Sequence, residues 1–198
     1  MGQVISNLSM SLDGFIEDAN GSVESVFEWY GAGPVEMTSA NPDVSFRLSA
    51  EDAAFLRETM ASIGALVAGR RLFDVAGGWK GAHPAGVPVF VVTHRVPTRE
   101  EFPYPDAPFT FVTDGVESAI AQAKAVAGEK DVSIASPSIA QQALNAGLLD
   151  VITVDLAPCV LGAGTPYFAK LASTPVRLDN PTIRAGSRVT HLRYRVLR

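Results

Sequence analysis

The sequence is poor in residues that form covalent or metal cross-links. Its 198 residues include one cysteine, Cys159, and three histidines that lie far apart, His83, His94 and His191. A single cysteine cannot close an internal disulfide, and a multi-cysteine zinc site needs several. We therefore expect neither a disulfide framework nor a metal site, and we interpret Cys159 as a small buried side chain rather than a nucleophile.

Long apolar runs and an excess of positive charge are also missing. No stretch approaches the roughly 18 apolar residues of a membrane span, and no basic leader precedes an apolar block at the N-terminus. Lys and Arg number 16 against 21 Asp and Glu, for a net charge of -5, whereas nonspecific nucleic-acid binding depends on basic patches. We expect a cytoplasmic protein with no membrane or nucleic-acid partner.

Three common motifs are absent as well. The dinucleotide fingerprint G-x-G-x-x-G, the P-loop and the G-x-S-x-G elbow do not occur, so none of the three sites they mark is predicted. The composition, with 47 % hydrophobic and 19 % charged residues, is that of a globular protein. At this length a single domain spanning residues 1–198 is expected.

Short runs rich in Val, Ile and Phe alternate with helical patterns along most of the chain. The runs predict strands at 4–8, 65–68, 87–92, 109–112, 132–135 and 151–154. Such near-continuous apolar runs are typical of parallel strands buried on both faces. Helices are predicted at about 49–62, 114–128 and 137–147. Ser49 with Asp52, and Asp114 with Glu117, are expected to form capping boxes.

The C-terminal segment has a different pattern. Residues 175–183 and 187–197 are predicted to form an antiparallel pair joined at 184–186. In the second strand His191, Arg193 and Arg195 alternate with apolar or neutral residues, so we expect these three side chains on a solvent-exposed face. The Gly/Pro-rich stretches 31–42 and 77–88 are predicted loops. The fold class is therefore α/β, with a mixed, mostly parallel sheet and a C-terminal antiparallel hairpin.

Polar residues follow several of the predicted strands, where α/β sheets bind ligands. Asp13, in SLDGFI, either shapes an Asp-Gly turn or faces a ligand. The segment Gly69-Arg70-Arg71 joins a strand to a helix, and its arginines either bind an anion or are solvated. Thr93-His94-Arg95 either forms a solvated polar end of a strand or binds an extra phosphate, such as the 2′-phosphate of NADP. A further strand-to-helix junction is formed by Ser136, Pro137, Ser138 and Ile139.

Taken in order, the segments SLDGFI, VAGRRLFD, VPVFVVTHR and ALNAGLLDVITVDLAPCVLGAGTPYF resemble the dihydrofolate-reductase superfamily. The branch they resemble is the reductase domain of bifunctional riboflavin-biosynthesis proteins. The resemblance extends from about Val4 to Leu197, and its last segment is the most specific. It implies a three-layer αβα dihydrofolate-reductase-like fold, an NADPH site and frequent homodimers.

The resemblance also implies roles for individual residues. It places Asp13 beside the nicotinamide and substrate. The implied cofactor-phosphate residues are Gly69, Arg70 and Arg71, and those for the 2′-phosphate are Thr93, His94 and Arg95. The segment 48–55 resembles the helix that carries the substrate-binding acid in dihydrofolate reductases. Counting back from Phe55 selects Glu51, whereas helical geometry favours Asp52, so both remain candidates.

The junction at residues 136–139 departs from the family pattern. Where the family has Gly-Gly or Gly-Ala, this sequence has Ser136-Pro137. Glycines let the backbone approach a pyrophosphate closely, whereas Ser and Pro add Cβ atoms and Pro removes one N–H donor. Proline still suits the first position of a helix, and the serine hydroxyls of residues 136 and 138 can act as donors. Weak NADPH binding is therefore predicted.

These features predict an NADPH-dependent reductase that transfers a hydride to a C=N or C=O group of a small pteridine- or pyrimidine-like substrate. Reduction of a ribosylated aminopyrimidine, as in riboflavin synthesis, is one version, although no deaminase signature is attached. The alternative is a degenerate, non-enzymatic ligand-binding or dimeric scaffold protein, which Ser136-Pro137 favours. A homodimer is expected in either case, since it is the commonest oligomer.

Overall fold

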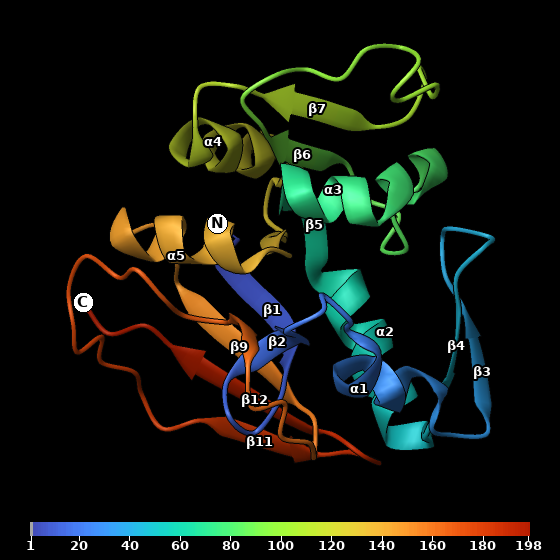
Figure 1. Cartoon of the computed structure of the whole chain (residues 1–198), viewed down its shortest axis with the longest axis vertical. Coiled ribbons are helices and arrows are strands. Elements are labelled where there is room, and N and C mark those ends of the chain that lie inside the picture. Colours follow the sequence, from blue (N-terminus) through green and yellow to red (C-terminus); the bar gives the residue numbers. More distant parts are fainter. Residues whose placement is uncertain (1) are drawn as a thin grey trace.

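The structure, a computed structural model that describes residues 2–198, is built on an eight-stranded sheet with the order β11-β12-β9-β1-β8-β5-β6-β7 (Figure 1). Neighbouring strands from β9 to β7 run parallel, whereas β12 is antiparallel to both β9 and β11. The predicted mixed sheet is therefore confirmed. Its strands are β1 (Val4–Met10), β5 (Ile63–Gly69), β6 (Val89–Val92), β7 (Phe109–Val112), β8 (Asp131–Ile134), β9 (Val151–Leu156), β11 (Thr182–Ala185) and β12 (Thr190–Arg195).

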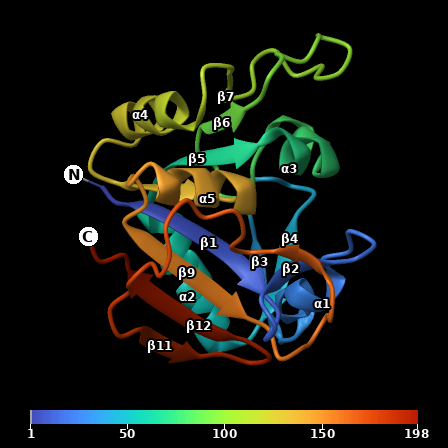
Figure 2. The same cartoon turned by 60° about the vertical axis from the view of Figure 1, so that its left-hand side comes forward.

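Helices cover both faces of this sheet. In Figure 2, α5 lies on the near side of β1 and β9, and α2 lies on the far side. Helix α4 joins α5 on one face, since both pack their buried side chains into the same apolar cluster with β1 and β8. The helices are α1 (Glu24–Phe27), α2 (Ala50–Ser62), α3 (Arg70–Val75), α4 (Val116–Ala127) and α5 (Pro137–Asn145), with 3-10 turns η1 (Glu28–Gly31) and η2 (Gly77–Gly81).

The two faces of the central strands differ in chemistry. Towards α4 and α5, strands β1 and β9 present apolar side chains such as Val4 and Val154. Towards α2 they present Ser9, Thr153 and Asp155, each no more than 5 % exposed. The expectation that these strands are buried on both faces is correct at these positions, but the α2 face of the sheet centre is polar.

Two short antiparallel pairs lie outside the main sheet. Strand β2 (Phe15–Asp18) pairs with β10 (Gly164–Pro166), and β3 (Val35–Thr38) pairs with β4 (Ser45–Leu48). The prediction of a loop over 31–42 is wrong at β3, because Met37 packs into an apolar cluster with Phe46, Leu48 and Trp29. Alternation over four residues is too short to distinguish such a strand from a loop.

The helix ends agree with the sequence at two places and differ at a third. Ser49 caps α2 by accepting a hydrogen bond from the backbone N–H of Asp52, and Pro137 occupies the first turn of α5. The capping box predicted for Asp114 and Glu117 is wrong. Gly115, with φ +102°, is the N-cap of α4 and no side chain caps that helix, because the chain enters it through a left-handed glycine.

The C-terminal hairpin also differs from its prediction. The first strand spans Thr182–Ala185 rather than 175–183, and only Leu178 earlier in that segment forms a bridge, to Val196. The predicted exposed face is wrong at His191, which is 4 % exposed. The reason is tertiary: α2 packs over this part of β12, and the ring of Phe55 stacks on the His191 ring at 3.7 Å.

Candidate functional site

The topology brings several predicted site residues to one edge of the sheet. Asp13 follows β1, Gly69 ends β5, Thr93 follows β6 and Ser136 follows β8. These four parallel strands are neighbours in the order β1-β8-β5-β6. Their carboxyl ends therefore meet at the same edge, which is where open α/β sheets bind their ligands.

Gly69 and Ser136 are joined directly at this edge. The backbone N–H of Gly69 donates to the Ser136 hydroxyl oxygen at 2.8 Å, and Ser136 is 3 % exposed. A Cβ on Gly69 would lie 3.4 Å from Ile139, so the strand end and the start of α5 pack closely. The Gly69 N–H is therefore satisfied within the protein by the Ser136 oxygen. The hydroxyl hydrogen of Ser136 remains available to donate to another group. Next to it, Pro137 is partly buried and Ser138 is exposed.

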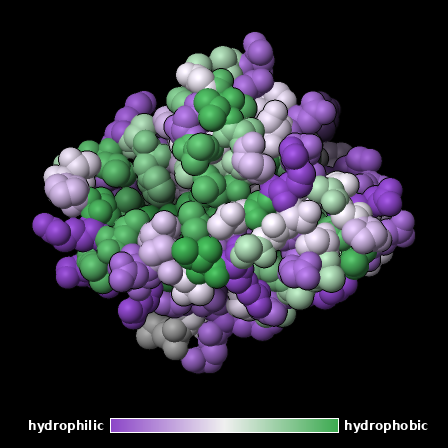
Figure 3. All heavy atoms as spheres, turned by 90° about the horizontal axis from the view of Figure 1, so that it is seen from below, coloured by the Kyte–Doolittle hydropathy of each residue, from purple (hydrophilic) through white to green (hydrophobic). Residues whose placement is uncertain are grey.

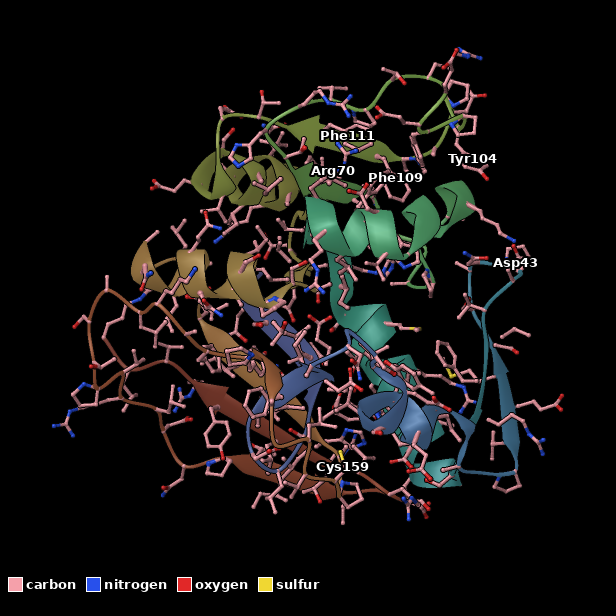
Figure 4. The ribbon with its side chains drawn as sticks, viewed as in Figure 1. Asp43, Arg70, Tyr104, Phe109, Phe111 and Cys159 are labelled. Atoms are coloured by element: carbon pink, nitrogen blue, oxygen red, sulfur yellow. The ribbon has the colours of Figure 1, made fainter. Side chains whose placement is uncertain are left out.

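Arg70 and Arg95 lie together beside the end of β6. An Arg70 Nη1–H donates to the carbonyl oxygen of Arg95 at 3.1 Å, and the Thr93 hydroxyl donates to the same oxygen at 2.8 Å. Figure 4 shows Arg70 at the start of α3 and Cys159 towards the opposite end of the molecule, and the Arg70 guanidinium lies 5.9 Å from the centre of the Phe73 ring. His94 is exposed beside them. The structure therefore brings two predicted cations to one place.

Both arginines already have carboxylate partners. Arg70 donates to Asp74 at 2.8 Å, and Arg95 forms a two-pronged ion pair with Glu101, both distances being 2.7 Å. The Arg95 guanidinium and the Thr98 backbone N–H hold the pKa of Glu101 at about 2. An incoming phosphate must therefore compete with Glu101 for the donors of Arg95.

Arg71 points to a different part of the edge, the β2–β10 pair. Its Nη1–H donates to Glu17 Oε1 at 2.5 Å, and the Thr165 hydroxyl donates to the same carboxylate oxygen. Burial raises the pKa of Glu17, but these two hydrogen bonds outweigh it and the net shift is downward. Together with Gly21, these residues line an open cleft of about 450 Å³. No sequence pattern indicated Glu17, because its partners lie 54 and 148 residues away.

Asp13 joins two loops at the same edge. Its carboxylate accepts from the Ser11 hydroxyl at 2.6 Å and from the backbone N–H groups of Leu161 and Gly162 at 3.1 and 2.7 Å. The Ser11 bond and these N–H groups lower the pKa of Asp13, although desolvation opposes them. Asp13 is therefore an ionised, exposed carboxylate that connects the loop after β1 to the loop after β9.

The two candidate acids of α2 have different environments. Glu51 is exposed, whereas Asp52 is 1 % exposed. Asp52 Oδ2 accepts from the Ser49 hydroxyl and from the backbone N–H of Ser187, and Oδ1 lies 3.1 Å from His191 Nε2. The protein itself supplies hydrogen-bond partners for both oxygens of Asp52, and the structure does not place either acid with the cofactor candidates.

His191 lies between two buried carboxylates, an arrangement that the sequence did not reveal. Its Nδ1 is 2.7 Å from Asp155, which is 4 % exposed, and its Nε2 faces Asp52. Burial lowers the pKa of His191, but the bonds to Asp155 and Asp52 outweigh it and raise the pKa overall. Burial raises the pKa of Asp155. This cluster holds α2, β9 and β12 together.

Some classes of site are not found in the part of the chain that the structure describes. Within residues 2–198, no group of three or more His, Cys, Asp or Glu side chains is arranged to hold a metal ion. Over the same range, no helix has both the length and the apolar content needed to cross a bilayer.

The family model for the RibD C-terminal domain matches residues 3–192. No curated protein matches the chain in sequence. Among solved structures, a Shewanella sp. PV-4 protein named for riboflavin biosynthesis has a TM-score of 0.70 at 22 % identity, with 100 % of both chains covered. Dihydrofolate reductase from Enterococcus faecalis, complexed with NADP(H), has a TM-score of 0.60 at 14 % identity, covering 98 % of this chain and 96 % of that one.

A third similar structure belongs to a longer protein. The Thermotoga maritima diaminohydroxyphosphoribosylaminopyrimidine deaminase/5-amino-6-(5-phosphoribosylamino)uracil reductase has a TM-score of 0.64 at 11 % identity. The match covers 99 % of this chain but only 57 % of that protein. All three likenesses concern the fold, since the sequence identities are low.

Proposed function

The chain belongs to the RibD C-terminal domain family and has the dihydrofolate-reductase-like fold, and from this premise we propose that it is an NADPH-dependent reductase. The family and the fold support a reductase role in general. The substrate we propose is a small pteridine- or pyrimidine-like heterocycle with a reducible C=N or C=O group. NADPH supplies the hydride when bound, and the protein contributes binding, orientation and electrostatics.

The observation that carries the proposal is the group of donors at the carboxyl edge of the sheet. Arg70, Thr93 and Arg95 lie within one hydrogen-bonded cluster at the ends of β5 and β6. Guanidinium groups match phosphate oxygens in geometry and charge. In our proposal Arg70 and Arg95 hold the 2′-phosphate, and Arg71 lies beside the pyrophosphate. Asp13 keeps the two substrate-side loops together.

The proposal is tested by binding and turnover with defined compounds. We expect calorimetric titration to show tighter binding of NADPH than of NADH. We also expect NADPH consumption with dihydrofolate or with 5-amino-6-(5-phosphoribosylamino)uracil. Equal affinity for the two cofactors would contradict the 2′-phosphate assignment, and absence of binding to both would contradict a reductase.

One observation favours a second candidate, a ligand-binding or scaffold protein without reductase activity. The Gly69 N–H, a backbone donor at the edge, is used by Ser136, and Pro137 provides no N–H at all. Both features remove donors that would otherwise point at a pyrophosphate. If neither the parent protein nor a variant with glycines at 136 and 137 binds a nicotinamide cofactor, this second function is the better one.

A further inference from the structure

A pocket of about 210 Å³ lies between α2 and the polar face of the main sheet. It lies over the amino-terminal half of β1, with Ile5 and Asn7 in its lining, and over Ser133 of β8 and Thr153 of β9. The cofactor candidates lie at the carboxyl ends of the parallel strands. The pocket is therefore a separate feature, and its chemistry does not depend on the proposed reductase activity.

A row of hydrogen-bonding side chains crosses the floor of this pocket. Asn7 of β1 is in register with Thr153 of β9, and Thr153 is in register with Arg193 of β12. Residues paired in this way point to the same face, and neighbouring strands lie about 4.8 Å apart. All three side chains line the pocket. The sheet thus presents an amide, a hydroxyl and a guanidinium side by side.

The polar groups at the centre of this pocket have no protein partner. Among residues 2–198, the hydroxyls of Ser133 and Thr153 and the amide of Asn7 form no hydrogen bond, although Ser133 and Thr153 are each only 5 % exposed. In residues 2–198, every side-chain nitrogen or oxygen that is sealed from solvent has a hydrogen-bond partner, so the unpartnered hydroxyls of Ser133 and Thr153 must be open to the pocket. Buried polar groups in folded proteins are normally satisfied by protein, water or ligand.

One guanidinium in the pocket lining, that of Arg193, is available to bind an anion. Arg184 forms an ion pair with Glu58 at 2.7 Å. The Arg193 guanidinium instead donates to the neutral amide oxygen of Gln3 at 2.8 Å. Within the described residues Arg193 has no carboxylate partner. Because Glu58 and Asp131 also line the pocket, a single negative charge suits it better than two.

We propose that this pocket binds the carboxylate of a small organic monoanion. The carboxylate accepts hydrogen bonds from Arg193, Thr153 and Asn7, and the apolar part of the ligand lies against the remaining wall. That wall is formed by Ile5, Phe55 and Ile63. A dry cavity of roughly 150 Å³ holds a benzene ring, so this pocket has room for a ligand of one ring. The hydroxyls of Ser133 and Thr153 lie too deep for the flat surface of a second protein copy.

The test uses benzoate as the probe, with benzyl alcohol as its neutral counterpart and inorganic phosphate as a polyvalent anion. Binding is followed by calorimetry and by the melting temperature of the full chain at millimolar probe. We expect benzoate to bind and to raise the melting temperature, with benzyl alcohol and phosphate binding roughly tenfold more weakly or not at all, because a hydrogen bond to a charged group is worth about a factor of ten.

Three variants separate a binding role from a structural one. Arg193→Gln and Thr153→Val should each weaken benzoate binding roughly tenfold. Thr153→Val should leave the melting temperature of the free protein unchanged or raised, because its hydroxyl has no partner to lose. Arg195→Gln is the control, since Arg195 lies two residues along β12, pairs with Asp179 and does not line the pocket; it should keep the parent affinity.

Several results would overturn the proposal. These are no binding of benzoate, equal binding of benzyl alcohol, or parent-like affinity in both Arg193→Gln and Thr153→Val. A marked loss of stability in Thr153→Val without ligand would show that the hydroxyl is structural. A change of molecular mass by light scattering in either variant would assign this face to a contact between copies of the chain.

Discussion

At the scale of single residues, the strongest electrostatic feature is His191 between Asp52 and Asp155. All three side chains are no more than 4 % exposed, and they come from three different elements. The two buried carboxylates favour the charged form of the histidine that is bonded to them, because a carboxylate without a partner would be costly to bury. The cluster therefore makes the packing of α2 on β9 and β12 depend on one proton.

The pH dependence of stability follows from the direction of the His191 shift. Its folded-state pKa is raised above the unfolded value of about 6.5. Its contribution is therefore complete below that pH and is lost as the pH rises through the folded-state pKa. We therefore expect the free energy of unfolding, measured with urea, to decrease as the pH rises through the folded-state pKa of His191. The His191→Gln variant should be about 3–5 kcal/mol less stable than the parent near pH 6. On the alkaline side, the alkaline limb of the curve, its free energy of unfolding should change less with pH than that of the parent.

His83 provides the matched control for this experiment. Burial lowers its pKa to about 4, so its contribution is present above about pH 6.5 and is lost as the pH falls towards 4. His83→Gln should therefore alter the acid limb, by about 3 kcal/mol at most, and leave the alkaline limb unchanged. An alkaline limb that is the same in His191→Gln and in the parent would refute the assignment.

A second prediction at this scale concerns cofactor choice and depends on the proposed function. Arg95→Ala removes two of the charge-assisted donors beside Thr93 and should weaken NADPH binding by about tenfold or more. NADH lacks the 2′-phosphate and should be almost unaffected. Calorimetric titration of both cofactors measures the difference, with Arg195→Ala at the opposite side of the sheet as the control. Equal losses for NADPH and NADH would contradict the role of Arg95.

At the scale of elements, the junctions between strands and helices decide what reaches the carboxyl edge of the sheet. The β8–α5 junction is rigid, because Ser136 bonds the end of β5 and Pro137 starts α5. The turn between β11 and β12 approaches α2 so closely that a Cβ on Gly186 would lie 1.9 Å from Asp52 Oδ1. Ser136 and Pro137 therefore fix how α5 starts beside the end of β5, and Gly186 allows the β11–β12 turn to approach α2.

Replacing Ser136-Pro137 by Gly-Gly tests the first junction. The change frees the Gly69 N–H and restores a second N–H, so NADPH should bind roughly ten- to a hundredfold more tightly. The free energy of unfolding should fall by about 1 kcal/mol or more, because the unfolded chain gains freedom. Titration and melting curves of both proteins measure these effects. Ser173→Ala, at an exposed position between β10 and β11, is the control; a glycine variant that binds no better would refute this interpretation of the junction.

Gly186→Ala tests the second junction. The added methyl group must displace the Asp52 carboxylate from His191 and from the Ser187 N–H, and we expect a loss of at least about 2 kcal/mol in unfolding free energy. Gly31→Ala is the matched control, because no atom lies within 4 Å of the site of its Cβ. Urea unfolding compares the two, and similar losses would show that Gly186 is not constrained by Asp52.

At the scale of the whole molecule, one end of the main sheet is left open. All four residues of the edge strand β11 are exposed, and the C-terminal segment adds exposed apolar side chains at Leu178, Ile183 and Leu197. Figure 3 shows a broad hydrophobic area on the left half of the face seen from below, bordered by hydrophilic side chains. Exposed apolar areas and open sheet edges are common sites of association between chains.

We propose on this basis that the protein is a homodimer. Twice the mass of the 20.9 kDa chain, about 42 kDa, is expected by light scattering at micromolar concentration, because twofold pairing is the commonest symmetric assembly. Ile183→Lys, on the edge strand, should shift the mass towards that of the monomer, whereas Val75→Lys, at an exposed apolar position on α3, should not. A parent protein with the monomer mass would contradict the proposal.

Local sequence chemistry determined much of the architecture. Runs of Val, Ile and Phe correctly indicated the parallel strands, Ser49 and Pro137 marked helix starts, and the segment motifs indicated the family. The sequence also predicted that Asp13, Gly69, Thr93 and Ser136 would lie at the carboxyl edge of the sheet, because each is at or just after the end of a predicted strand. Residues that follow parallel strands must share an edge whatever the details of packing.

Tertiary structure alone decided which side chains are partners. Asp52 and His191 are 139 residues apart, Glu17 and Arg71 are 54 apart, and Gly69 and Ser136 are 67 apart. The row from Asn7 to Arg193 exists only because three strands are aligned in one register. Sequence patterns report the preferences of neighbouring residues, whereas strand register and helix placement depend on the packing of the whole core, so the buried ion cluster and the polar pocket became visible only in the folded molecule.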